Sequence, residues 1–145
     1  MKKERLKAIL AVYLVINKDN KTLLYLRQNT GYCDGMYSLI AGHVEKDESI
    51  FDAMIREAKE EAGIDIKKED LRHLTTMHRL SDSERVDFFF ELKDFDGKII
   101  NKEPSKCKEL DFFDLDNLPK NTIDYVKKAL FHGKNEITIC DHGWE

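Results

Sequence analysis

Short apolar stretches, separated by turn-forming residues, recur along this 145-residue chain, a pattern typical of strands. In the first third of the chain these stretches cover residues 7–16, 22–27 and 36–41, the last of them ending at Gly42. The turn-forming residues at 17–21 predict that the first two strands are joined as a hairpin. Residues 29–35 are rich in turn formers and predict a loop.

A helical pattern follows Gly42 and lies between Ser49 and Gly63. Ser49 can cap the first turn, with Asp52 three residues on as its capping-box pair, and Gly63 is a natural residue just beyond the last turn. At roughly 100° per residue, the apolar residues of this segment share one face. We expect that face to pack into the core; it comprises Phe51, Met54, Ile55, Ala58 and Ala62.

The second half of the chain predicts further strands and one more helix. Strand-like stretches lie at residues 71–79, 85–93 and 109–113, and an amphipathic helix is expected at about 121–132. Phe88–Phe90 favours a core strand buried on both faces over a base-stacking platform. Strands interrupted by two helices predict one α/β or α+β domain, and the length suits a single domain over residues 1–145.

Composition and charge argue against several classes of function for this protein. Hydrophobic residues make up 41% and charged residues 36%, as in folded soluble proteins, and the net charge of −4 argues against broad binding of a nucleic-acid backbone. Residues 1–7 show no leader pattern, and no apolar stretch is long enough to span a membrane. Three widely spaced cysteines favour reduced thiols over disulfides or zinc. We therefore expect a cytoplasmic protein without a membrane or nucleic-acid partner.

Acidic residues gather on the predicted helix beside its apolar face. Glu57, Glu60 and Glu61 lie at helical spacing with Arg56, so three carboxylates share one side. Like charges at this spacing cost an isolated helix ~0.2–0.5 kcal/mol per pair. An exposed acidic face is the simplest interpretation of such a helix. The preceding glycine loop and a fourth acid, Glu48, favour a site for Mg²⁺ or Mn²⁺, which prefer oxygen ligands.

Residues 42–64 resemble the signature of the Nudix hydrolases, G-x5-E-x7-R-E-U-x-E-E-x-G-U, in which U is aliphatic. Gly42, Glu48, Arg56-Glu57, Glu60-Glu61 and Gly63-Ile64 match every constrained position, and Ala58 is the least typical residue. The order of strands and helices is also similar to this family over nearly the whole chain. The resemblance implies an α/β/α sandwich in which a mixed β-sheet lies between helices.

The resemblance also implies a reaction and roles for the motif residues. Family members hydrolyse a nucleoside diphosphate linked to another moiety, by attack of water on phosphorus. By this likeness Glu57, Glu60 and Glu61 bind the metal ions, and one of them deprotonates the water. Glu48 assists from the loop, and Arg56 orients the glutamates through charge-assisted hydrogen bonds. The carbonyl of Ala41 is a further expected metal ligand.

The substrate is less well determined than the chemistry, because specificity residues lie outside the motif. The first expectation is a MutT-like (d)NTP pyrophosphohydrolase that releases a nucleoside monophosphate and pyrophosphate. A diphosphatase for ADP-ribose or nucleotide sugars is the alternative, and hydrolysis of RNA caps ranks third. A non-catalytic domain that senses nucleotides is the rival from another class, although all four motif acids are present. Either a monomer or a homodimer fits.

Four residues beyond the motif are candidates for metal or substrate binding. Glu103 resembles a late carboxylate of the MutT-like branch, with Glu109 as runner-up, and an exposed acid is nearly as plausible. Asn121 resembles a base-contacting asparagine, yet capping of the last helix is favoured. Arg27 is a candidate for phosphate binding, and a surface ion pair explains it equally well.

Other residues stand out less clearly. His78 and Arg79 follow a strand and are weaker candidates for substrate contact, since strand alternation also explains them. Tyr32, Tyr37 and Trp144 are possible stacking partners for a base, with ordinary packing the stronger expectation. Trp144 so near the C-terminus predicts a tail that folds over the site or contacts another copy.

Overall fold

Five strands form one mixed sheet at the centre of the molecule. The computed structural model describes residues 3–93, 95 and 97–145, so the first two residues of the N-terminal segment lie outside it. In spatial order the strands are β5 (Ile40–His43), β1 (Ile9–Val15), β7 (Glu84–Leu92), β6 (Leu71–Leu80) and β9 (Ile139–His142). The β1–β7 and β6–β9 pairs are parallel, and the other two pairs are antiparallel.

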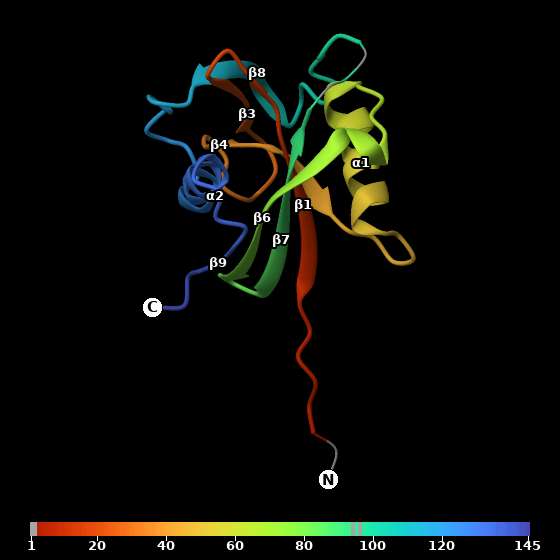
Figure 1. Cartoon of the computed structure of the whole chain (residues 1–145), viewed down its shortest axis with the longest axis vertical. Coiled ribbons are helices and arrows are strands. Elements are labelled where there is room, and N and C mark those ends of the chain that lie inside the picture. The colour runs from red at the N-terminus through yellow and green to blue at the C-terminus, as the bar shows by residue number, and fades with distance from the viewer. Residues whose placement is uncertain (1–2, 94, 96) are drawn as a thin grey trace.

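A smaller antiparallel sheet lies beside the mixed sheet. It consists of β2 (Asn17–Lys18), β3 (Lys21–Arg27), β4 (Tyr37–Ser38) and β8 (Cys107–Asp114). The helices are α1 (Ile50–Ala62), the short 3₁₀ helix η1 (Lys68–Asp70) and α2 (Asp124–Lys134). Figure 1 shows α1 and α2 on opposite sides of the strands. The predicted α/β/α sandwich with a mixed sheet is therefore confirmed.

Each face of the mixed sheet packs on one helix, because its side chains alternate between the faces. On the α1 side, Met54 and Ala58 pack against a cluster that includes Leu14 and Phe90. On the α2 side, Val126 and Ala129 belong to a cluster with the strand residues Val15, Met77 and Phe89. The central strand β7 thus contributes to both cores, as predicted for Phe88–Phe90, although Phe88 itself is only half-buried.

The ends of α1 are fixed by its capping residues. The hydroxyl of Ser49 accepts a hydrogen bond from the amide of Asp52 at 3.1 Å, and Gly63 ends the helix in the left-handed region with φ 68°. That conformation is readily available to glycine and strained for most other residues. The helix predicted between Ser49 and Gly63 is therefore confirmed, and its register holds the motif residues in place.

The sequence predictions for the first hairpin and for the start of the last helix are wrong in part. The chain does reverse at Asp19 and Asn20, both with positive φ, but the strand paired with β3 there is the short β2, whereas β1 joins the other sheet. The last helix begins at Asp124 and not near residue 121. Asn121 and Ile123 exchange backbone hydrogen bonds with Tyr37, and this extended bridge to β4 excludes the helix.

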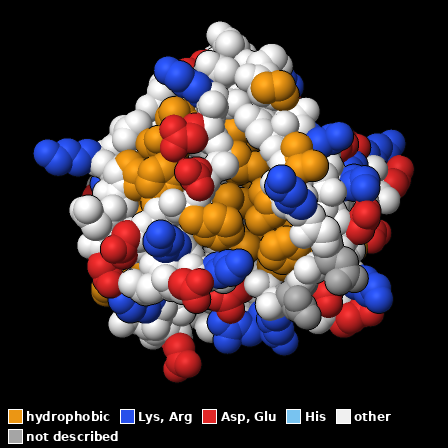
Figure 2. Space-filling view, turned by 90° about the horizontal axis from the view of Figure 1, so that it is seen from above, with side chains coloured by type: hydrophobic (Ala, Val, Ile, Leu, Met, Phe, Trp, Pro, Cys, Tyr) orange, Lys and Arg blue, Asp and Glu red, His pale blue; other side chains and the backbone are white. Residues whose placement is uncertain are grey.

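The surface carries charges of both signs. Seen from above in Figure 2, Lys and Arg side chains alternate with Asp and Glu side chains around exposed apolar groups. No helix within residues 3–93, 95 and 97–145 has the length and apolar character needed to cross a membrane.

Loss of the N-terminal cap should weaken α1. Ser49→Ala removes the acceptor for the amide of Asp52, so we expect the free energy of unfolding to fall by about 1 kcal/mol in urea titrations. Ser49→Asp keeps an acceptor and is the matched control, expected within a few tenths of the wild type. Equal stabilities of the alanine variant and the wild type would contradict this role for Ser49.

Candidate active site

The three motif glutamates of α1 line one cavity of about 660 Å³, together with residues from both sheets and from α2. Glu60 is the outermost, with 52% of its side chain exposed, whereas Glu57 is 13% exposed and Glu61 is buried. Helical spacing places the three at successive depths along one wall. The acidic face predicted from the sequence is therefore the wall of a cavity rather than a freely solvated surface.

Arg56 holds the acids of the motif together. Its Nε and Nη2 donate to the two carboxylate oxygens of Glu48 at 2.8 and 3.0 Å, a bidentate pair. Its Nη1 donates to Glu57 at 2.7 Å and to Glu60 at 3.3 Å, and Nη2 also reaches the carbonyl of His43. The hydrogen bonds from Arg56 lower the pKa of Glu48 to about 2. Glu48 is thus an anionic partner of Arg56, and it does not line the cavity.

Gly42 leaves room for the close approach of the Glu57 carboxylate. A Cβ at position 42 would lie 2.1 Å from Oε1 of Glu57 and 2.2 Å from its carboxyl carbon. Gly42 pairs with Val12 across the β5–β1 ladder, so the strand has no freedom to move aside. The motif glycine is therefore explained by space for a carboxylate.

Burial disfavours the anionic form of the two inner glutamates, Glu57 and Glu61. Desolvation raises the pKa of Glu61 well above its ordinary value, and the charges of Glu57 and Glu103 add to this effect. The amide of Ala41 donates to Oε2 of Glu61 at 3.0 Å and opposes it. Desolvation also raises the pKa of Glu57 despite its bond to Arg56. A divalent cation among these groups would offset their mutual repulsion and restore the charged forms.

The donor set fits a hard divalent ion. Glu57, Glu60, Glu61 and Glu103 all line the cavity, which gives oxygen ligands of the type that Mg²⁺ and Mn²⁺ prefer. Within the described part of the chain, no three His, Cys, Asp or Glu side chains are already close enough to hold an ion. Glu57 accepts a hydrogen bond from Arg56 through Oε1, and Glu61 accepts one from the amide of Ala41 through Oε2.

The candidates outside the motif divide into two groups. Glu103, Arg27 and Ala41 line the cavity, whereas Glu109 and Asn121 do not. Arg27 makes no surface ion pair among the described contacts; it donates to the carbonyl of Tyr32 and the hydroxyl of Thr30 and so orders the loop after β3.

Asn121 is exposed and lines a separate hollow beside Gly35. It donates to the carbonyl of Gly35 and does not cap α2, whose N-cap is Ile123. The favoured capping role of Asn121 is therefore wrong, because the residues before α2 bridge to β4.

An aromatic and basic wall faces the glutamates, and most of it was not predicted. Tyr13, Tyr25 and Tyr125 line the cavity, as do Tyr32 and Arg79, both of which the sequence analysis named as candidates for substrate contact. Burial raises the pKa of Tyr13 to about 12, so its hydroxyl stays protonated. These residues come from β1, β3, the loop after β3, β6 and α2, and only the tertiary fold brings them together.

Arg79 is the centre of this wall and is almost fully buried. Its Nε donates to Oδ2 of Asp87 at 2.6 Å, and its guanidinium lies 3.8 Å from the ring centroid of Tyr125. Its Nη atoms approach the hydroxyls of Tyr32 and Tyr13 at 3.4 Å each. The side chains of Arg79 and Asp87 are only 2% and 0% exposed. One ion pair therefore orders three tyrosines.

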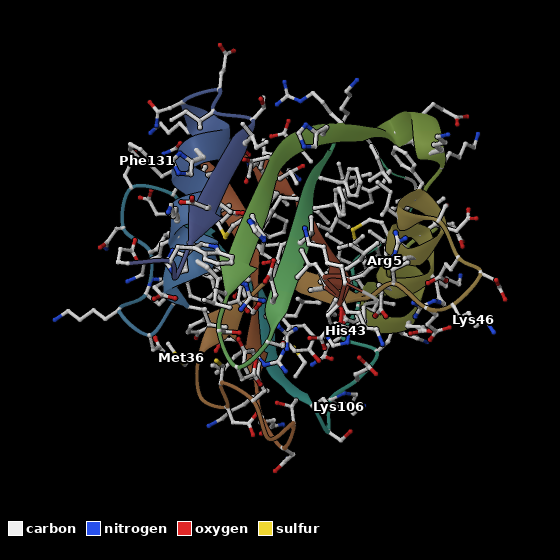
Figure 3. The ribbon with its side chains drawn as sticks, turned by 90° about the horizontal axis from the view of Figure 1, so that it is seen from below. Arg5, Met36, His43, Lys46, Lys106 and Phe131 are labelled. Carbon is white, nitrogen blue, oxygen red and sulfur yellow. The ribbon has the colours of Figure 1, made fainter. Side chains whose placement is uncertain are left out.

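Basic side chains lie at the rim of the cavity. Arg85 on β7 approaches His43 at 3.1 Å, and Lys106 lies in the loop before β8. Figure 3 shows His43 and Lys106 on the same side of the molecule, seen from below. Burial and the nearby Arg85 lower the pKa of His43. Positive groups thus face the acidic wall across the opening, an arrangement suited to a ligand that carries phosphates.

The comparison with known families agrees with this geometry. The model for the NUDIX domain matches residues 7–132. The chain therefore belongs to the NUDIX family and is an enzyme of the Nudix hydrolase type.

Two curated relatives illustrate the range of similar proteins. The chain is 36% identical over 118 residues to an ADP-ribose pyrophosphatase from Methanocaldococcus jannaschii, covering 81% of this chain and 68% of that protein. It is 29% identical over 131 residues to the NAD-capped RNA hydrolase NudC from Vibrio atlanticus, covering 81% of this chain. The match spans only 46% of the NudC protein.

Solved structures share the fold. A MutT NUDIX hydrolase from Burkholderia pseudomallei superposes with a TM-score of 0.79 at 24% identity, covering 88% of this chain and 98% of that one. A MutT protein from Methanosarcina mazei Go1 gives a TM-score of 0.77 at 19% identity, covering 91% and 98%. At these identities the likeness shows the fold alone.

Substitution at Gly42 should act through Glu57. We expect Gly42→Ala to displace the Glu57 carboxylate and to lower metal-dependent turnover by about 10²-fold or more, as misplaced catalytic groups do. The double variant Gly42→Ala/Glu57→Ala removes the clash, so its urea midpoint should recover while turnover stays low. A single variant with normal turnover would contradict the proposed contact.

Divalent ions should stabilise the folded protein. At an ion concentration 100 times the dissociation constant, the gain in unfolding free energy is about 2.7 kcal/mol, which predicts a rise of several degrees in the melting temperature. The rise should shrink in Glu57→Gln/Glu61→Gln, measured by calorimetry with MgCl₂ or MnCl₂ against EDTA. An equal rise in both proteins would place the ion elsewhere.

Proposed function

We propose that this chain is a Mg²⁺- or Mn²⁺-dependent diphosphatase for a small nucleoside diphosphate derivative. The observation that carries the proposal is the single cavity in which the α1 glutamates face Arg79, Arg85 and four tyrosines. Diphosphates are dense in negative charge, so an acidic wall alone would repel them. Bound divalent ions supply charge neutralisation and activation of water in such sites.

The residues have separate roles in this proposal. Glu57, Glu60, Glu61 and Glu103, with the carbonyl of Ala41, hold the ions, and one glutamate takes the proton from the attacking water. Arg56 and Glu48 position Glu57 without touching the substrate, as their mutual bidentate pair supports. Arg27, at the border between the cavity and the ordered loop, contacts phosphate.

ADP-ribose is the first substrate to test. The 36% identical relative from M. jannaschii bears the name ADP-ribose pyrophosphatase, and the alignment covers 81% of this chain. Among the tyrosines of the cavity lining, Tyr32 is half-buried and offers a ring for stacking a base, whereas Tyr13, Tyr25 and Tyr125 are buried. The (d)NTP pyrophosphohydrolase favoured by the sequence analysis remains the second prediction, and the NudC relatives add NAD to the panel.

A substrate panel tests whether the chain acts as a hydrolase or as a nucleotide-sensing domain. ADP-ribose, nucleotide sugars, NAD and each (d)NTP are incubated with MgCl₂ or MnCl₂, and nucleotide products are separated by chromatography. We expect turnover of ADP-ribose that EDTA abolishes reversibly. Substitution of a residue that only supports a metal ligand typically costs about 10- to 100-fold in activity. Glu60→Gln should lower turnover by more than this.

Glu69→Gln is the matched control, because Glu69 is an exposed acid on η1 away from the cavity. It should retain wild-type turnover. Retained nucleotide binding with no turnover of any compound would favour the sensing domain. Turnover in EDTA would contradict the role of α1.

A further inference from the structure

Arg79 and Tyr125 both belong to the lining of the cavity that holds the motif glutamates. The two residues come from different elements, β6 and α2, and stack at 3.8 Å. Both side chains are buried, so under the proposed function the pair supports the part of the cavity wall that the non-reacting part of the substrate contacts. Its affinity then depends on how firmly the two side chains are held in place.

Residues 139–144, which we call the C-terminal brace, reach both members of the pair. Strand β9 lies parallel to β6, and His142 is the register partner of Arg79. Paired residues of neighbouring strands share a face of the sheet, so His142 lies beside Arg79. The His142 ring meets the Tyr125 ring at 6.4 Å in an edge-on arrangement, and its Nε2 lies 3.5 Å from Asp124.

Trp144 anchors the end of the brace one residue from Arg79. Its Nε1 donates to the carbonyl of His78 at 3.0 Å, and its ring lies 4.7 Å from the His78 ring. Gly143 has φ 87°, and a Cβ there would lie 2.1 Å from the carbonyl oxygen of Leu80. Only glycine permits this close turn, so the tryptophan is placed by a specific backbone conformation.

The brace also connects to α2. The ammonium group of Lys128 donates to the carbonyl of Asp141, one turn beyond Tyr125 on the same helix. The segment therefore contacts β6 along its length and α2 at three positions, Asp124, Tyr125 and Lys128. Neither His142 nor Trp144 lines the cavity.

We propose that His142 and Trp144 are positioning residues, which hold the Arg79–Tyr125 pair and thereby set the affinity for the non-reacting moiety of the substrate. This inference rests on the proposed function. The brace acts through two cavity residues and leaves the glutamate wall untouched. Its loss should therefore change KM without changing the chemistry at the metal ions.

Steady-state kinetics with the best substrate of the panel test the brace. For Trp144→Ala and His142→Ala we expect KM to rise roughly three- to tenfold, less than the ~10²-fold that a misplaced reacting group can cost. The kcat and the Mg²⁺ dependence should stay within about twofold. Trp144→Phe keeps a ring on His78 and should recover part of the loss.

Phe131→Ala is the matched control. Phe131 is 61% exposed on α2 and points away from the cavity side (Figure 3), so its removal should leave KM unchanged. Equal changes in kcat and KM for Trp144→Ala, with altered Mg²⁺ dependence, would overturn the inference in favour of a general loss of structure.

Tyr125→Leu tests whether the substrate depends on the Arg79–Tyr125 pair, whereas failure of the proposed function would appear as no turnover in the substrate panel. If this variant raises KM and the brace variants do not, the brace is overturned. If Tyr125→Leu also leaves KM unchanged, the substrate does not contact Tyr125; the brace is then overturned, whereas EDTA-sensitive turnover still supports the proposed function.

If no compound is turned over, the affinity for AMP tests the role of the brace without requiring activity. Trp144 is the single tryptophan of the chain, so its fluorescence reports AMP titrations of the wild type, His142→Ala and Tyr125→Leu. A three- to tenfold weaker Kd for His142→Ala supports the brace. An unchanged Kd for His142→Ala overturns it.

Discussion

The guanidinium of Arg56 holds three carboxylates, those of Glu48, Glu57 and Glu60, within reach of one another. At these separations the acids would repel one another strongly in a partly desolvated site. Arg56 offsets that repulsion, and its contact with the carbonyl of His43 ties α1 to the end of β5. Helix, loop and strand edge therefore form one unit, and the geometry of the acidic wall depends on that unit.

The close approach of β5 and α1 has a second consequence. Because Glu57 fills the space beside Gly42, and Ala41 donates to Glu61, the backbone of β5 forms part of the acidic wall. The inner glutamates bear raised pKa values as a result of burial. Without a bound ion, the buried carboxylates of such a site are electrostatically unfavourable, and a divalent cation reduces this unfavourable free energy.

The opposite wall depends on a different ion pair. Arg79 and Asp87 are buried between the sheet and α2, where removal of one partner typically costs about 3–5 kcal/mol. The pair orders tyrosines that come from β1, α2 and the loop after β3. The two walls are thus built independently, one by local helical spacing and the other by packing of distant segments.

The sequence by itself determined the features that local spacing controls. Ser49 and Gly63 bound α1, and helical geometry alone places Glu57, Glu60 and Glu61 on one side, so the acidic wall follows from a few consecutive turns. The strands β6 and β7 were also predictable, because their apolar patterns are long. The order of these elements predicted one α/β or α+β domain, and the resemblance to the Nudix signature implied the α/β/α sandwich.

Only the tertiary structure decided which segments meet. The pairing of β1 with β7, the extended bridge that delays α2 to Asp124, and the return of β9 to β6 all join residues far apart in the chain. Backbone hydrogen bonding between strands is largely indifferent to side-chain identity, so register comes from the packing of the whole sheet. For that reason the sequence identified the acids of the proposed metal site, whereas only the fold brought Arg79 and Tyr125 into the same cavity.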